Sequence, residues 1–231
     1  MNESNFIKSI KKSYELFDNL GLSRSFTVPS SLNVNEAFNR LALDTSTNYQ
    51  DLFFCGLKIG QYNFILKDLT YFQFSRKSED DVRYAFYPSP FDPSVLKVID
   101  QLTRARDIDV LDDEAFAVSI ESLELNYRRP VIRYDYSPKQ YKPVKHPTSH
   151  LHVGTYGEDR WCVERFLTPY AFSLQIAKMY FGDYWEALTV EEKDGTRRNE
   201  LDDYLYAERS ACKITPLDKF GSSDKKHFFF C

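Results

Sequence analysis

The sequence predicts a mixed α+β fold: antiparallel meander sheets, each followed by a helix that starts at proline, with an amphipathic helix at the N-terminus. Aromatic side chains make up 16% of the 231 residues and Gly totals only 8, a usage that favours antiparallel sheets packed with rings. Short alternating segments separated by turn-forming residues indicate the strands. A capping residue precedes proline twice, at Asp92-Pro93 and at Thr168-Pro169, which is typical of helix starts.

Two helices are predicted ahead of the first strands. Residues 4–19 place their apolar side chains at helical spacing with lysines opposite, and Gly21 follows as a stop signal. A second, short helix is predicted over 34–43, where Asn33 or Ser31 can cap the first turn.

Two successions of strands follow, and each ends in one of the proline-started helices. The first succession comprises 52–57, 62–66, 70–74 and 82–87. The second comprises 116–126, 131–136, 150–155 and 161–166. Their matching order predicts a pseudo-duplication, with halves 1–107 and 108–190, inside a single α+β domain over 1–190. Residues 191–231 are expected to form an extension with one helix over 199–210 and an aromatic tail, Phe228 to Phe230, that docks onto the body.

Composition argues against several classes of protein. No apolar stretch approaches the roughly 20 residues that span a bilayer, and the polar N-terminus lacks a signal-peptide core, so a cytoplasmic protein without a membrane partner is expected. The four cysteines lie far apart with no CxxC spacing, which argues against a zinc knuckle and a disulfide framework. The usual nucleotide-binding, hydrolase and zincin motifs are absent. The net charge of −4 excludes a polycation that would coat nucleic acid indiscriminately.

Three of the four histidines fall within seven residues: His146, His150 and His152. Residues two apart on a strand point the same way, so His150 and His152 are expected to share one face about 7 Å apart while Leu151 and Val153 face the core. The pattern therefore predicts a pair of imidazoles presented to solvent.

A second strand, 131–136, carries Arg133 and Asp135 on one face. If the two strands are neighbours, these residues converge with His150 and His152 into a site suited to metal-free phosphodiester cleavage. One imidazole would accept a proton and the other donate one, while Asp135 orients a ring. Arg133 or Arg160 would balance the phosphate charge. RNA is the favoured substrate because its 2′-hydroxyl supplies an internal nucleophile.

Two other roles stay open for the histidines at this point. They can be half-exposed structural residues bonded to carbonyl groups, or metal ligands with His146 or Asp135 as the third. The spacing H-x3-H-x-H matches no established zinc signature. The predicted site therefore includes no metal and no cofactor.

The stretch from Arg128 to Lys145 is basic and rich in tyrosine. It predicts contact with nucleic acid, in which its cations bind phosphates and its rings stack on bases. With Arg160, the predicted binding residues are Arg128, Arg129, Lys139, Lys142, Lys145, Tyr136 and Tyr141. The alternative is a solvated loop whose tyrosines pack on the sheet edge. The hairpin residues Asp80, Asp81 and Arg83 are interpreted as a solvated turn.

Several segments in combination resemble a known bacterial family. They are residues 62–68, 72–74, 83–91, 147–154 and 167–170, which together span about 60 to 185. The family they resemble is domain of unknown function 2290. The resemblance implies a cytosolic factor of the mobile, restriction or phage-defence repertoire, and it transfers no activity. The pattern of this family includes His150 and His152. The tail after about residue 190 lies outside the pattern.

The leading hypothesis is a nucleic-acid-processing protein of a defence or toxin-type system, acting as a metal-independent ribonuclease with His150 and His152 as the acid/base pair. The competing hypothesis is a non-catalytic accessory subunit that binds nucleic acid or a larger effector such as an ATPase or nuclease. In a third hypothesis, the protein is a small partner of an ATPase or nuclease and binds it through the aromatic tail.

Overall fold

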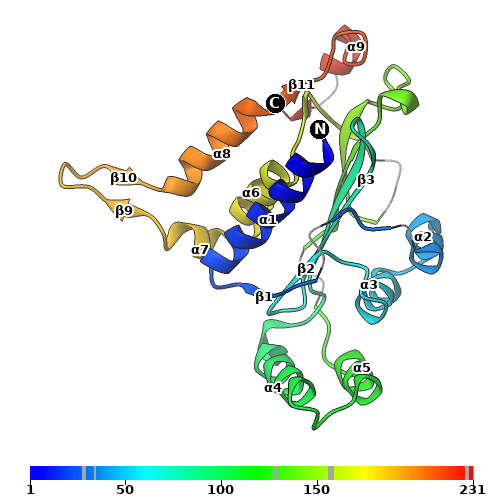
Figure 1. The fold of residues 1–231 in the computed structure, drawn as a ribbon, viewed down its shortest axis with the longest axis vertical. Helices are drawn as coiled ribbons and strands as arrows, with labels where there is room; N and C mark the ends of the chain where they lie inside the picture. The colour runs from blue at the N-terminus through cyan, green and yellow to red at the C-terminus, as the bar shows by residue number, and fades with distance from the viewer. Residues whose placement is uncertain (28–29, 34, 127–128, 156–158, 227–228, 231) are drawn as a thin grey trace.

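One sheet organises the molecule, and its first seven strands form an antiparallel meander in chain order (Figure 1). The computed structural model describes residues 1–27, 30–33, 35–126, 129–155, 159–226 and 229–230. The strands of the meander are β1 (Ser23–Phe26), β2 (Phe64–Leu66), β3 (Tyr71–Ser78), β4 (Asp81–Tyr87), β5 (Ile132–Tyr136), β6 (Ser149–Val153) and β7 (Trp161–Val163). An eighth strand, β12 (Phe229–Phe230), pairs in parallel with β7. The predicted mixed α+β class is confirmed.

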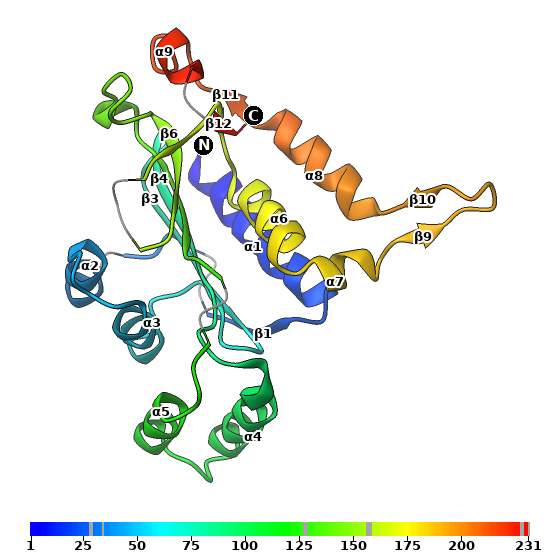
Figure 2. The same ribbon diagram turned by 180° about the vertical axis from the view of Figure 1, so that it is seen from behind.

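Helices cover both faces of the sheet (Figures 1 and 2). On one face lie α1 (Glu3–Asn19) and α6 (Pro169–Tyr180), and on the other lie α2 (Glu36–Leu43) and α3 (Tyr49–Lys58). Because side chains alternate along a strand, Tyr84 and Phe86 of β4 enter the first core while Ala85 and Tyr87 enter the second. Two further helices, α4 (Leu96–Asp107) and α5 (Asp113–Glu121), extend the second core at one end of the sheet.

The C-terminal part packs back onto the body. After α7 (Gly182–Glu186), a hairpin of β9 (Val190–Glu191) and β10 (Arg197–Arg198) projects outward, and α8 (Glu200–Ala211) returns along α6 (Figure 2). Then β11 (Lys213–Ile214) pairs with β8 (Arg165–Phe166), and α9 (Ser222–Lys225) precedes β12. The main chain of Phe229 and Phe230 thus joins the sheet, whereas Phe228 lies outside the described residues. No helix in the described part of the chain is long and apolar enough to cross a membrane.

Two predicted strands are wrong, since 52–57 falls in α3 and 116–126 begins in α5. Both helices start at an acceptor side chain: Asn48 accepts the Asp51 N–H, and Asp112 accepts the Ala115 N–H. A short apolar run does not separate a strand from a buried helix, and these caps decide it. The cap of α2 is Asn35, not Asn33 or Ser31. The short strand β1 was not predicted.

The predicted separate sheets are a single sheet, and the two proline-started helices do not occupy equivalent places. The turn η1 (Pro93–Val95) leads into α4, whose Ile99 lies in the second core. Thr168 caps α6, whose Phe172 lies in the first core on the opposite face. The structure therefore gives no support to a pseudo-duplication of 1–107 and 108–190.

Candidate functional site

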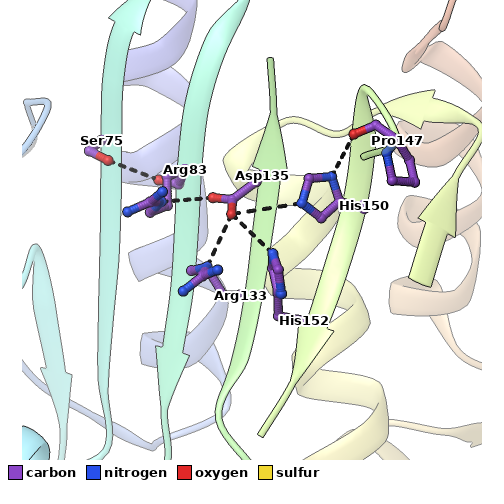
Figure 3. A network of polar contacts seen from close by, with 7 residues as sticks. All are labelled: Ser75, Arg83, Arg133, Asp135, Pro147, His150 and His152. Atoms are coloured by element: carbon purple, nitrogen blue, oxygen red, sulfur yellow. Dashed lines mark hydrogen bonds and ion pairs between the residues drawn. The ribbon is translucent and has the colours of Figure 1, made fainter. Parts of the chain in front are cut away.

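The candidate site is a row of polar side chains that crosses β4, β5 and β6 on the sheet face shared with α2 and α3 (Figure 3). The register places Asp135 directly opposite His150, and Arg133 opposite His152. On the other side of β5, Arg83 lies opposite Asp135. Side chains paired across antiparallel strands share a face, so the predicted convergence is confirmed and gains an arginine from β4.

The carboxylate of Asp135 is the centre of this row. Its Oδ1 accepts from Arg83 Nε at 2.8 Å, and its Oδ2 accepts from Arg133 Nε at 3.1 Å. His152 Nε2 lies 3.3 Å and His150 Nε2 lies 4.0 Å from the same Oδ2. Burial alone raises the pKa of Asp135, but the contact with His152 and the charges of Arg83 and Arg133 outweigh burial and lower the pKa far below its ordinary value. Asp135 is therefore a carboxylate throughout the neutral range.

The two histidines are buried, with 1% of His150 and 2% of His152 exposed, so the prediction that they face solvent is wrong. The loop that follows β5, here called the covering loop, contacts His150 through His146 and Pro147. The ring of His146 lies edge-on to that of His150, 4.9 Å between centroids, and the Pro147 carbonyl accepts from His150 Nδ1 at 2.8 Å. Burial lowers the pKa of His150 to about 3 and also lowers that of His152.

These properties conflict with the acid/base roles that the sequence suggested. A general acid must carry its proton at the working pH, and an effective general base has a pKa near that pH. His150 fulfils neither condition near pH 7, because burial keeps its ring uncharged and weakly basic. The arrangement is therefore better suited to holding charged groups than to transferring protons.

The basic residues predicted to contact nucleic acid do not gather in one place. Lys139, Lys142 and Lys145 are exposed on the covering loop. Arg160 lies near the site: burial lowers the pKa values of His146 and His152, and the charge of Arg160 adds to this effect. Arg129 does not join it, since its guanidinium lies over the Phe181 ring at 4.8 Å in the first core. Arg128 lies outside the described residues.

Both tyrosines that were predicted to stack on bases make contacts within the fold. Tyr136 is 5% exposed and stacks on Phe166, with 4.3 Å between ring centroids. The Tyr141 hydroxyl donates to Asp224 at 2.9 Å, and Lys219 covers its ring. Both rings hold parts of the fold together, which agrees with the alternative in which these tyrosines pack rather than bind.

Comparison with models of protein families identifies the family of this chain. The model of the family described as "Uncharacterized conserved protein (DUF2290)" matches residues 22–215. The chain belongs to this family. The DUF2290 match is longer than the expected span of 60–185, so residues 191–215 lie inside it, contrary to expectation. Searches of curated proteins and of solved structures found no significant match.

Sequence reasoning missed one charged residue of this DUF2290 site, Arg83, which was interpreted as part of a solvated turn. The signal was present, because Arg83 alternates with the apolar residues of β4 and so shares a face with Ala85 and Tyr87. A hollow of about 70 Å³ opens beside Arg83 and Arg133. Its polar lining comes mostly from amide side chains: Asn33, Asn35, Asn39, Gln61 and Gln73.

One group within the described ranges of the DUF2290 chain brings three metal-ligating atoms together: those of Asp135, His150 and His152, all within 4.8 Å of one another. Two imidazoles and a carboxylate are a common ligand set for divalent transition metals. Cys162 of β7 lies opposite His150 and is buried, and burial raises the pKa of its thiol.

Proposed function

We propose that this DUF2290 protein binds nucleic acid through its phosphates without cleaving it, as an accessory subunit. One observation carries the proposal: Asp135 fixes two guanidinium groups on a face whose histidines are buried and uncharged. Arg83 and Arg133 each use Nε for Asp135, which leaves their terminal nitrogens as donors. Planar guanidinium groups held in place are well suited to phosphate oxygens.

Exposure and neighbouring charges support the same function. The side chain of Arg83 is 51% exposed, and that of Arg133 is 21% exposed. The lysines of the covering loop, Lys139, Lys142 and Lys145, are exposed as well. The preference for RNA depended on cleavage chemistry. The proposed binding function therefore does not distinguish RNA from DNA.

The test is the affinity of the full chain for a labelled single-stranded oligonucleotide, followed by fluorescence anisotropy between 50 and 200 mM salt. Affinity is expected to fall steeply with salt because phosphate binding releases counterions. Arg83→Ala is expected to weaken binding about 10-fold and to reduce the salt slope by about 1. The matched control is Arg104→Ala, an exposed arginine of α4 that pairs with Asp100. Binding that ignores salt, or equal losses in both variants, would refute the proposal.

Ribonuclease activity stays as a second candidate because His152 Nε2 lies 3.3 Å from Asp135 Oδ2, next to Arg133, as a carboxylate that orients an imidazole would lie. It requires both buried imidazoles to become accessible to RNA. The test replaces His150 and His152 together by alanine and measures RNA turnover in protein that is still folded. Turnover that is unchanged, or absent from the parent protein, removes this candidate.

A role in defence or mobile elements, a cytoplasmic location and an effector bound through the tail remain predictions. The pairing of Phe229 and Phe230 with β7 offers another use for the tail. Copurification of partners with a chain that lacks residues 228–231 distinguishes the two uses, because retained partners count against the tail as the attachment point.

A further inference from the structure

His150 has a ring nitrogen that no group in the described part of the chain satisfies. A carbonyl oxygen can only accept, so the 2.8 Å contact with Pro147 places the hydrogen on His150 Nδ1. In the neutral ring, Nε2 then carries a lone pair. That nitrogen is buried and has no hydrogen-bond partner. A buried acceptor without a donor is costly, and each such group requires an explanation.

The atoms around this lone pair are suited to a cation. Asp135 Oδ2, another acceptor, lies 4.0 Å away. His152 Nε2 approaches the same oxygen to 3.3 Å, and its own Nδ1 is buried without a partner. Figure 3 shows the two rings and the carboxylate converging from adjacent strands.

We propose that Asp135 Oδ2, His150 Nε2 and His152 Nε2 bind a divalent transition-metal ion of the zinc class. A metal accepts the lone pair of His150 and replaces the unfavourable approach of two acceptors. The Pro147 carbonyl supplies the second-shell bond that commonly holds a ligating histidine in the required tautomer. The inference does not depend on nucleic-acid binding.

The distances agree with a preformed site that needs a small closure. Zinc bonds of about 2.0–2.2 Å to nitrogen and oxygen place neighbouring ligand atoms about 3.4 Å apart in a tetrahedron. The Asp135–His152 separation is already 3.3 Å, and the largest separation in the group is 4.8 Å. No proton has to be displaced from His150 Nε2. The Nε2–H that His152 directs at Asp135 Oδ2 must be released, or move to Nδ1 of the same ring, when the metal binds.

The charges of Arg83 and Arg133 oppose the metal and indicate what completes its coordination. Both guanidinium groups contact the carboxylate, so they reduce its attraction for a cation. An anionic fourth ligand would offset this repulsion. Hydroxide and inorganic phosphate are the simplest ligands of this kind, and we expect phosphate to strengthen metal binding.

The experiment uses the full chain, stripped with a chelator and reloaded with Zn²⁺. About one zinc per chain is expected by elemental analysis, and Co²⁺ in its place should give visible absorption bands. His150→Ala is expected to lower Zn²⁺ affinity at least ~100-fold, beyond the effect of losing a second-shell partner. His146→Ala is the matched control, because His146 adjoins His150 but lies outside the ligand group.

X-ray absorption of zinc-loaded wild-type protein keeps the proposal testable even if a variant fails to fold. Two imidazoles in the metal shell support the site, whereas a sulfur-dominated shell overturns it. Wild-type protein that binds no zinc, full retention by His150→Ala, or an equal loss in His146→Ala also overturns it. Because these readouts contain no nucleic acid, their failure is distinct from failure of the proposed binding function.

Discussion

At the scale of single residues, Asp135 is a charge held by several partners at once. Two guanidinium groups and one imidazole approach its two oxygens within 3.3 Å, and only 15% of its side chain is exposed. Because its partners are this close, the carboxylate of Asp135 is expected to stabilise the fold in addition to its proposed role as a metal ligand. Removal of its charge would leave Arg133, which is also mostly buried, without a counterion.

Asp135→Asn is therefore expected to destabilise the chelator-treated protein by about 2–4 kcal/mol, because breaking a largely buried ion pair leaves a partner uncompensated. Denaturant unfolding followed by circular dichroism measures the change. Asp100→Asn is the control, since Asp100 pairs with Arg104 on the surface and should change stability by less than about 1 kcal/mol. Similar effects of the two substitutions would show that the Asp135 cluster contributes little.

Element boundaries depend on caps that sequence patterns reveal only in part. The predicted helices over 4–19, 34–43 and 199–210 correspond to α1, α2 and α8 within two residues at each end. For α1, the signal was apolar spacing that is helical over several turns. The run in α3 was interpreted as a strand, although Asn48 ahead of it caps a helix. Gly56 of α3 lies against Tyr71 of β3, so the helix approaches the sheet where a side chain would not fit.

Gly56→Ala tests this close approach. Alanine favours helix by up to about 1 kcal/mol over glycine, yet its Cβ would clash with the Tyr71 hydroxyl and with Phe38. We expect a net destabilisation of about 1–3 kcal/mol from overpacking. Gly182→Ala is the matched control, because a Cβ at Gly182 meets no atom within 4 Å. A stabilised Gly56→Ala protein would mean that α3 and the sheet separate easily.

At the scale of the whole molecule, buried tyrosines lie in both cores and link stability to alkaline pH. Tyr84 and Tyr134 lie in the first core, and Tyr71 and Tyr87 lie in the second. Burial raises the pKa of all four hydroxyl groups, that of Tyr87 to about 12. The folded chain therefore keeps protons that the unfolded chain releases above about pH 10.

The contribution of these tyrosines to the free energy of unfolding should accordingly be fully present below pH 10. It should decline as the pH rises from 10 toward 12. For Tyr87 alone, a shift from 10.0 to about 12 corresponds to roughly 3 kcal/mol over that window. Tyrosinate absorbance and far-ultraviolet circular dichroism, recorded on one sample, measure the effect. The two signals should change together at unfolding. Full tyrosine ionisation near pH 10 in protein with an intact fold would contradict the assigned burial.

The sequence alone determined which residues could act together, because alternation along a strand is a local property of the backbone. It therefore placed Arg133 beside Asp135 and His150 beside His152, and it identified the mixed α+β class. It also identified the segments that carry the family resemblance.

Only the tertiary structure decided how those pairs meet and what covers them. Arg83 reaches Asp135 from a strand 52 residues earlier, and the loop ending at Pro147 buries His150. Register and burial arise from contacts between segments distant in the chain, which no local pattern encodes. The sequence predicted that His150 and His152 form a solvent-exposed acid/base pair. In the structure both rings are buried, and the uncharged ring of His150 directs the lone pair of its Nε2 toward the carboxylate of Asp135.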